Sequence, residues 1–398
     1  MGKIARRTIL STLAGLPVAG MLGGITPAAG ETKPLVMDME DVALEKAPKY
    51  RGVVYDVGLN FGPVLSVETF DLAQVEYEIR AIKNSLHANA IRIEGEIIDR
   101  LVAATRIAHQ HGLTVFFNPW KWNADADALR PYYLQAAKEA EKLRKEGVDI
   151  VFIAGCEYPI FQKGLLAGDT VDARLASLGA LFADGPEKAK AQMDATWGGL
   201  SDILKSFVEV IRPEFRGPVT YAATPFETID WSMFDFVGID HYRGEESAEK
   251  YVEQFNGYKV HNKPVICMEV GACTYVGAAK AGGGGFMIME DMNPDGSARF
   301  KGGVVPTRSE REQADYIETQ VKLLANNDAE GVFVFVFAAP FYTHGEGAND
   351  LDLVAYSLVK TYRKDDPRSK AMPPWAPKES FHRVAGLFAQ MKNGEAGD

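Results

Sequence analysis

Two glutamates follow apolar, β-branched segments at positions where they could act together on one substrate. Glu157 ends the segment 152–157, and Glu269 lies in the similar segment 265–271. If both segments are strands of one small barrel, the two carboxyls face each other across its mouth. A protonated carboxyl opposite an ionised one is the arrangement that cleaves glycosidic bonds. We therefore predict that Glu157 and Glu269 are catalytic; the alternative is that each only caps the helix that follows it.

Further polar and aromatic residues interrupt or end similar apolar segments. We predict that these residues bind the substrate: Asp56, Arg92, Asn118, Trp120, Trp122, Tyr158, Asp240, His241, Tyr242 and Phe337. Side chains alternate along a strand, so Asp240 and Tyr242 share one face, and His241 lies on the other unless the strand bends. By the same rule Cys267 shares a face with Glu269, and we expect it to line the pocket wall.

Several of these residues also have a purely structural interpretation. Arg92 lies between two isoleucines and should point into the barrel, where a buried arginine needs a carboxylate partner. Glu94 could supply that partner in an ion pair unrelated to catalysis. Asn118, Trp120 and Trp122 either contact a sugar or pack a loop.

Eight short apolar segments alternate with helix-periodic segments, which predicts a parallel sheet covered by helices. The predicted strands are 52–56, 90–94, 113–118, 150–154, 218–222, 236–240, 264–268 and 331–337. Eight such units within residues 49–392 predict a single-domain (β/α)8 barrel with enlarged loops and a last helix at 380–392. The alternative is an open, doubly wound α/β sheet, but no G-x-G-x-x-G turn follows the first strand.

The first thirty residues have the layout of an export signal peptide. Arg6 and Arg7 precede an apolar segment at 9–25, and small residues follow at 27–30. This pattern resembles a twin-arginine signal, with an ordinary secretory signal or an uncleaved anchor as alternatives. We interpret residues 31–48 as a flexible tether. No later apolar segment is long enough to span a membrane, so we expect a mature protein that is secreted, periplasmic or on the cell surface.

Composition and charge disfavour several other classes of protein. The 398 residues are 46% hydrophobic and 24% charged, as in globular proteins, and the net charge is −11. An acidic chain without a basic patch is a poor partner for nucleic acid. Three cysteines cannot form a disulfide framework. His109 and His111 have a zinc-ligand spacing, but they end a predicted helix before a glycine, so we predict no metal and no cofactor.

These residues and segments resemble the clan of retaining glycoside hydrolases with (β/α)8 barrels, clan A. The resemblance covers about residues 50–345 and implies that Glu157 is the acid/base and Glu269 the nucleophile. It also implies that Arg92 and Tyr242 hold the nucleophile. Two positions depart from the clan pattern. Cys156 stands where the clan has an asparagine that binds the sugar 2-hydroxyl, and Phe337 stands near the place of a tryptophan that underlies the sugar ring.

The resulting hypothesis is an exported glycosidase that cleaves an oligosaccharide, polysaccharide or other glycoside by double displacement. The alternatives are a barrel that binds glycans without turnover, a transglycosylase that uses the same residues, and a defence or interaction protein. The long segments 158–194 and 272–308 could close one end of the cleft, which favours short oligosaccharides or chain ends.

Overall fold

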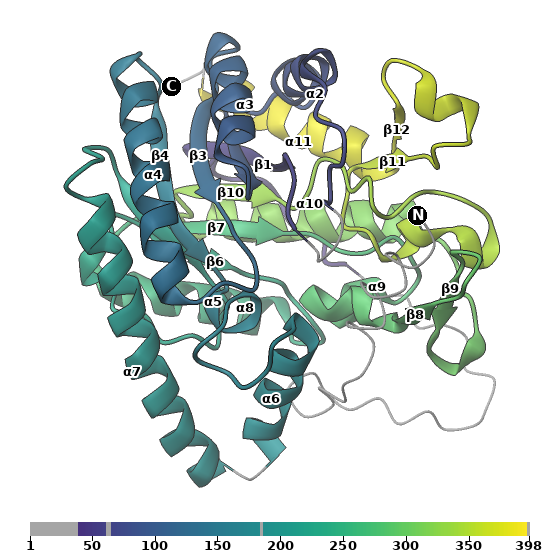
Figure 1. Cartoon of the computed structure of the whole chain (residues 1–398). Coiled ribbons are helices and arrows are strands. Elements are labelled where there is room, and N and C mark those ends of the chain that lie inside the picture. The colour runs from purple at the N-terminus through teal and green to yellow at the C-terminus, as the bar shows by residue number, and fades with distance from the viewer. Residues whose placement is uncertain (1–38, 61–64, 184–185, 396–398) are drawn as a thin grey trace.

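The computed structural model describes residues 39–60, 65–183 and 186–395 of the chain. The predicted export signal and the first part of the tether lie outside these residues. In the described part, eight parallel strands close into a barrel in the order β1-β10-β7-β6-β5-β4-β3-β2 (Figure 1). Their bounds are β1 Tyr50–Asp56, β2 Ala90–Gly95, β3 Thr114–Pro119, β4 Ile150–Cys156, β5 Val219–Ala223, β6 Val237–Asp240, β7 Val265–Val270 and β10 Gly331–Val334. The predicted (β/α)8 fold and its eight strands are confirmed.

Amphipathic helices cover the outside of the barrel, as Figure 1 shows. The main ones are α2 Leu72–Asn84, α3 Ile98–Gln110, α4 Ala126–Lys145, α7 Pro186–Ile211, α8 Ala248–Gly257, α10 Glu310–Asn326 and α11 Glu379–Glu395. Side chains from the preceding loops cap several of them: Asp71, Asp125, Ser247 and Ser309 each accept a hydrogen bond from a backbone N–H of the first turn. Such caps satisfy donors that the helix itself leaves free, and so define where each helix begins.

The strands separate two apolar layers. In β2, Ile91 and Ile93 pack outward against the helices, while the side chains of Arg92 and Glu94 point into the barrel. The inner layer is formed by residues such as Val54, Phe116, Val151, Ile266 and Phe333. This alternation is the period-two pattern expected of a strand with both faces buried. The polar residues inside the barrel are therefore enclosed by apolar side chains.

The loops after β4, β7 and β10 carry additional elements. Helices α5 Tyr158–Phe161 and α6 Val171–Ala183 follow β4, and helix α9 Ala278–Ala281 with the hairpin β8 Met289–Met292 and β9 Ala298–Phe300 follows β7. After β10, strand β11 Val359–Thr361 pairs with β12 Trp375–Pro377. These short strands were not expected from the sequence. No helix within the described residues combines the length and the apolar character that crossing a bilayer requires.

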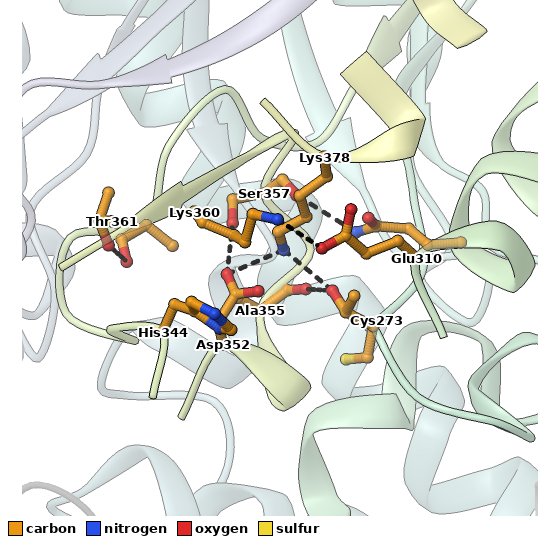
Figure 2. A network of polar contacts seen from close by, with 12 residues as sticks. Cys273, Glu310, His344, Asp352, Ala355, Ser357, Lys360, Thr361 and Lys378 are labelled. Carbon is orange, nitrogen blue, oxygen red and sulfur yellow. Dashed lines mark hydrogen bonds and ion pairs between the residues drawn. The ribbon is translucent and has the colours of Figure 1, made fainter. Parts of the chain in front are cut away.

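A buried ionic cluster joins the loops after β7 and β10 to the start of α11 (Figure 2). The Nζ atom of Lys378 lies 2.8 Å from Oδ1 of Asp352, and both side chains are fully buried. Lys378 also donates to the hydroxyl of Thr274, and Arg308 contacts the other carboxylate oxygen of Asp352 at 2.7 Å. Burial lowers the pKa of Lys378 and raises that of Asp352, while their mutual attraction opposes both shifts. The cluster is stable only while its charges remain paired.

We expect Lys378→Met to lower the free energy of unfolding by about 3 kcal/mol, because it leaves a buried carboxylate with one cation fewer. Lys142→Met is the matched control, since Lys142 pairs with Glu139 on the exposed side of α4 and should cost less than about 1 kcal/mol. Urea unfolding followed by circular dichroism measures both. Equal transition midpoints for the two variants would contradict a structural role for the cluster.

Candidate active site

Irregularities in two strands determine where the two predicted catalytic glutamates point. The pairing of β4 with β5 shifts between Ile153 and Cys156, and the backbone at Gly155 has a φ of 124°. The pairing of β6 with β7 also shifts, so that Asp240 pairs with Glu269 rather than with Met268. An extra residue in a strand reverses the side on which the next side chain lies. A bulge just before the end of each strand therefore determines the direction of the glutamate side chain.

The bulge in β7 makes one expectation wrong. Cys267 was expected to share a face with Glu269, but it packs in the outer layer between sheet and helices. Its thiol contacts the backbone carbonyl of Glu269 at 3.2 Å, while the side chain of Glu269 points into the barrel. Strict alternation therefore fails over these two residues, and Cys267 does not line the pocket wall.

Arg92 is the cation at the centre of the site. Its Nη1 lies 3.0 Å from Oε1 of Glu269 and 3.5 Å from Oδ1 of Asp240, and its Nη2 lies 3.3 Å from Oε2 of Glu94. Its Nε donates to Oδ1 of Asn118 at 3.1 Å. All of these side chains are at least nine-tenths buried. Arg92 therefore pairs with Glu94, the expected carboxylate partner, and also contacts Glu269, and its role at the site stays a prediction.

Glu269 is held from two sides. Arg92 contacts one carboxylate oxygen, and the hydroxyl of Tyr242 donates to the other at 2.7 Å. Burial raises the pKa of Glu269, whereas Arg92 and Tyr242 stabilise its charged form and oppose that shift. Two donors on one carboxylate fix its position and favour ionisation.

Glu157 has the opposite surroundings. It follows β4 in a left-handed conformation, with φ 42° and ψ 47°, and is half-buried. Burial raises the pKa of Glu157 well above its usual range, and the negative charges of Asp240, Glu269 and Glu227 raise it further. No hydrogen-bond donor to its carboxyl occurs among the described residues. These surroundings favour a protonated Glu157 beside an ionised Glu269.

Several predicted substrate-binding residues lie around this pair. Asn118 and Asp240 are fully buried next to Arg92, and the Cys156 thiol donates to Asp240. Burial raises the pKa of both Asp240 and Glu94 well above the usual range. With one arginine among three carboxyls, proton uptake by some of them relieves the repulsion that remains.

The predicted aromatic residues and Asp56 lie at the edge of the site. Trp120 contacts Trp122 with a ring separation of 5.3 Å, and both pack on Phe161 from the loop after β4. Asp56 ends β1, pairs in register with Glu94 and accepts a hydrogen bond from the backbone of Gly58. Burial raises the pKa of Asp56 to about 6.

Three predicted residues point away from the carboxylates, and these placements correct the sequence analysis. The ring of His241 stacks on Tyr251 of α8 at 4.2 Å, and burial lowers its pKa to about 4. Tyr158 lies in the outer layer near Phe207, with its hydroxyl bonded to a backbone carbonyl. Phe337 is also in the outer layer, against Trp375. The outward direction of His241 is the one that alternation predicts, whereas Tyr158 and Phe337 follow the regular part of their strands, where alternation no longer predicts direction.

Other residues near the site were missed. Phe335, the residue after β10, packs against the inner layer where Phe337 does not, and its ring lies 6.0 Å from that of Tyr356. Tyr356 in turn contacts Tyr242 at 5.8 Å. Counting in steps of two from Phe333 could have found Phe335, whereas Tyr356 lies on a distant loop and carries no sequence signal.

Tyr221 and Glu227 form a second group that the sequence analysis did not identify, and this group contacts the backbone next to Glu157. The hydroxyl of Tyr221 donates to Glu227 at 2.6 Å and accepts from the backbone N–H of Tyr158, the residue after Glu157, at 2.7 Å. Glu227 also accepts from the backbone and hydroxyl of Thr224. Hydrogen bonds of this group therefore fix the backbone next to Glu157, and the negative charge of Glu227 raises the pKa of Glu157.

Two sets of side chains have spacings that could hold a metal ion. Ligand atoms of Cys156, Asp240 and Glu269 lie within 4.8 Å of one another, as do those of His344, Asp350 and Asp352. The Arg92 guanidinium contacts every member of the first set, and Arg308 contacts both aspartates of the second. An arginine already lies among the carboxylates of each set, which disfavours a further cation. The prediction of no metal stays a prediction.

Comparisons with known proteins agree on the fold. No protein-family model and no curated protein matches the chain. A solved GH113 β-1,4-mannanase in a complex structure matches 87% of this chain and 99% of its own, with a TM-score of 0.53 and 13% identity. A second GH113 β-1,4-mannanase structure has a TM-score of 0.52 at 12% identity, over 86% of this chain and 99% of that one.

The chain has the barrel fold of solved glycosidases. A third match supports this conclusion: a calcium-binding mutant of β-glucuronidase 2 from Bacteroides uniformis, with a TM-score of 0.51 and 13% identity. That match covers 86% of this chain but 35% of the longer protein. At such identities the similarity establishes the (β/α)8 fold, and any activity has to be argued from the side chains of this chain.

We expect Glu227→Gln to lower the pKa of Glu157, because it removes a neighbouring negative charge that disfavours ionisation. Burial raises the pKa of Glu227 to about 7, so its charge acts fully above that pH. Titration of the Glu157 carboxyl by ¹³C NMR measures the shift. Glu78→Gln is the control, a buried carboxyl bonded to Tyr55 and Trp375. An unchanged Glu157 titration in Glu227→Gln would rule out the electrostatic link.

Proposed function

We propose that this protein is a retaining glycoside hydrolase in which Glu157 is the acid/base and Glu269 the nucleophile. The observation that carries the proposal is the asymmetry of the two carboxyls. Arg92 and Tyr242 bind Glu269 and favour its charge, whereas burial and neighbouring negative charges raise the pKa of Glu157. A nucleophile and an acid that operate together need this division of roles. The export signal predicted from residues 1–30 is part of the proposal and places the reaction outside the cytoplasm.

The reaction proceeds in two displacements. The Glu269 carboxylate attacks the anomeric carbon as the glycosidic bond breaks, and Glu157 gives its proton to the departing oxygen. A glycosyl ester on Glu269 results. In the second step Glu157, now ionised, takes a proton from water, and the water oxygen attacks the anomeric carbon and releases Glu269. Two inversions retain the anomeric configuration. An alcohol of another sugar in place of water gives transglycosylation.

Cys156 limits which substrates fit the proposal. Its thiol is fully buried, donates to Asp240 and contacts Nη2 of Arg92 at 3.2 Å. A thiol engaged in this way cannot replace an asparagine side chain that binds a sugar 2-hydroxyl. The substrate is therefore one whose 2-position is recognised by other groups or not at all, and a screen should include furanosides beside pyranosides.

A glycan-binding barrel without turnover is the second candidate, and Cys156 is the observation that favours it. Loss of a 2-hydroxyl contact removes an interaction that strengthens in the transition state of many glycosidases. The two candidates differ in one measurement. A binding protein retains saccharides without releasing reducing ends, whereas an enzyme releases them.

We expect Glu269→Gln to reduce hydrolysis of every substrate by about 10⁴-fold or more, because no other group can form the glycosyl ester. Glu157→Gln should slow substrates with poor leaving groups severely and spare aryl glycosides with activated leaving groups, because the latter need no proton. Steady-state kinetics on a panel of aryl glycosides, with the product anomer followed by ¹H NMR, measures both effects. Full activity in Glu269→Gln, or release of the inverted anomer, would exclude the proposed mechanism.

We expect a bell-shaped dependence of kcat/KM on pH. Activity falls at low pH as Glu269 takes up a proton and can no longer attack. Activity falls at high pH as Glu157 loses its proton, and this limb is displaced upward because burial and nearby carboxylates raise the pKa of Glu157. In Glu157→Gln the high-pH limb should disappear for activated substrates. Its persistence there would assign the limb to another group.

A further inference from the structure

Residues 39–48, here called the N-terminal strap, precede the barrel in the sequence and lie against its outside. Leu44 packs against the outer apolar layer. At the end of α10, the side chain of Asn326 accepts a hydrogen bond from the backbone N–H of Glu45 at 2.9 Å and donates to the carbonyl of Ala43 at 2.8 Å. These contacts fix the second half of the strap on α10.

Glu40 connects the first half of the strap to the turn after β6. Nη1 and Nη2 of Arg243 each lie 2.7 Å from one carboxylate oxygen of Glu40, although 203 positions separate the two residues. The Arg243 side chain is 2% exposed and that of Glu40 is 43% exposed. Two parallel charge-assisted hydrogen bonds give such a pair a defined geometry. A guanidinium this deeply buried requires a negative partner, and the strap supplies it.

Arg243 directly follows Tyr242, whose hydroxyl donates to Glu269. The backbone N–H of Arg243 donates to the hydroxyl of Tyr316 at 2.7 Å, and the same hydroxyl donates to the Arg243 carbonyl at 2.8 Å. Its Nε donates to the backbone carbonyl of Glu246 at 2.9 Å. Both the side chain and the backbone of Arg243 therefore hold the turn on which Tyr242 lies.

The loop after β7 packs closely over this turn. A Cβ atom on Gly283 would lie 3.2 Å from the ring of Tyr242, and one on Gly282 would lie 3.0 Å from the Arg243 carbonyl oxygen. Glycine is therefore the residue that allows this approach. Closely packed interiors transmit small displacements to neighbouring groups. A shift of the Arg243 backbone consequently moves the Tyr242 ring and its hydroxyl relative to Glu269.

We infer that Glu40 is a positioning residue for the proposed reaction. By neutralising Arg243 it holds the turn after β6 in place, and so keeps the Tyr242 hydroxyl bonded to Glu269. The inference rests on the proposed function and adds a residue outside the barrel to it. It also assigns the N-terminal strap to the active enzyme, so any removal of the predicted export signal takes place before Glu40.

The test is Glu40→Gln in the full chain, which removes the charge and keeps the size of the side chain. The Arg243 guanidinium then has no counter-charge and turns toward water, and Tyr242 no longer donates to Glu269. The ionised form of Glu269 loses a donor, so its pKa rises. We expect the acid limb of kcat/KM for an aryl glycoside to move up by about one pH unit, which is a tenfold loss of kcat/KM below that limb. The alkaline limb should not move.

Glu45→Gln is the matched control. Glu45 lies on the same strap with an exposed side chain, and the substitution preserves the backbone N–H that contacts Asn326. Its acid limb should coincide with that of the wild type. The other charged or titratable groups around Glu269 are unchanged in both variants: Arg92 and Glu94 from β2, Cys156 and Glu157 at the end of β4, and Asp240 from β6.

A double-mutant cycle with Arg243→Met separates positioning from a general loss of stability. Without the cation the strap carboxylate has nothing to neutralise, so Glu40→Gln should cause no further shift of the acid limb in that background. Full additivity of the two shifts would overturn the inference. Glu40→Asp is the second variant should Glu40→Gln fail to fold: it keeps the charge on a shorter side chain and should shift the limb in the same direction by less.

Titration of the Glu269 carboxyl by ¹³C NMR, without substrate, distinguishes failure of the inference from failure of the proposed function. A raised pKa of Glu269 in Glu40→Gln, in a protein that hydrolyses no glycoside, would retain the link from Glu40 to Glu269 and exclude the proposed function. Glu269-dependent hydrolysis with the same Glu269 pKa and the same acid limb in Glu40→Gln would retain the proposed function and overturn the inference.

Discussion

One buried guanidinium holds the centre of this barrel together. Arg92 contacts Glu94, Asp240 and Glu269 within a fully enclosed layer of side chains. A buried charge without partners costs several kcal/mol, so the arginine requires the carboxyls and the carboxyls require the arginine. Burial raises the pKa values of Glu94 and Asp240, and repulsion from Glu269 raises them further, because one positive charge cannot neutralise three negative ones. These surroundings favour the protonated form of some of the carboxyls around the one cation.

The difference between the two glutamates is a consequence of where Arg92 reaches. Its guanidinium and the Tyr242 hydroxyl both contact Glu269, whereas Glu157 has negatively charged neighbours. Hydrogen bonds fix the backbone next to Glu157 instead: the N–H of Tyr158 donates to the Tyr221 hydroxyl, which in turn donates to Glu227. Different groups therefore determine the protonation and the backbone position of Glu157. A carboxyl whose backbone is fixed can keep its side chain free for a proton transfer.

Function on this scaffold depends on loops that the barrel merely positions. The insertions after β7 and β10 meet in the ionic cluster around Lys378 and Asp352, which also ties them to α11. The same insertions supply two walls of a cavity beside β1. The stability of the loops and the shape of this cavity are thus linked, because one set of segments serves both. Known glycosidases share the fold with this chain at 12–13% identity.

The amino-acid sequence by itself determined the eight strands, the closed barrel and the clustering of Arg92, Tyr242, Glu157 and Glu269 at one end of it, because apolar periodicity and strand-end position are local properties. Tertiary structure alone decided the directions of Cys267, Tyr158 and Phe337. A bulge depends on pairing with neighbouring strands, and one extra residue moves the next side chain to the other face. Tyr221, Glu227 and Tyr356 also escaped prediction, because contacts between distant loops leave no local pattern. Direction at a strand end is a property of the closed sheet, not of its separate segments.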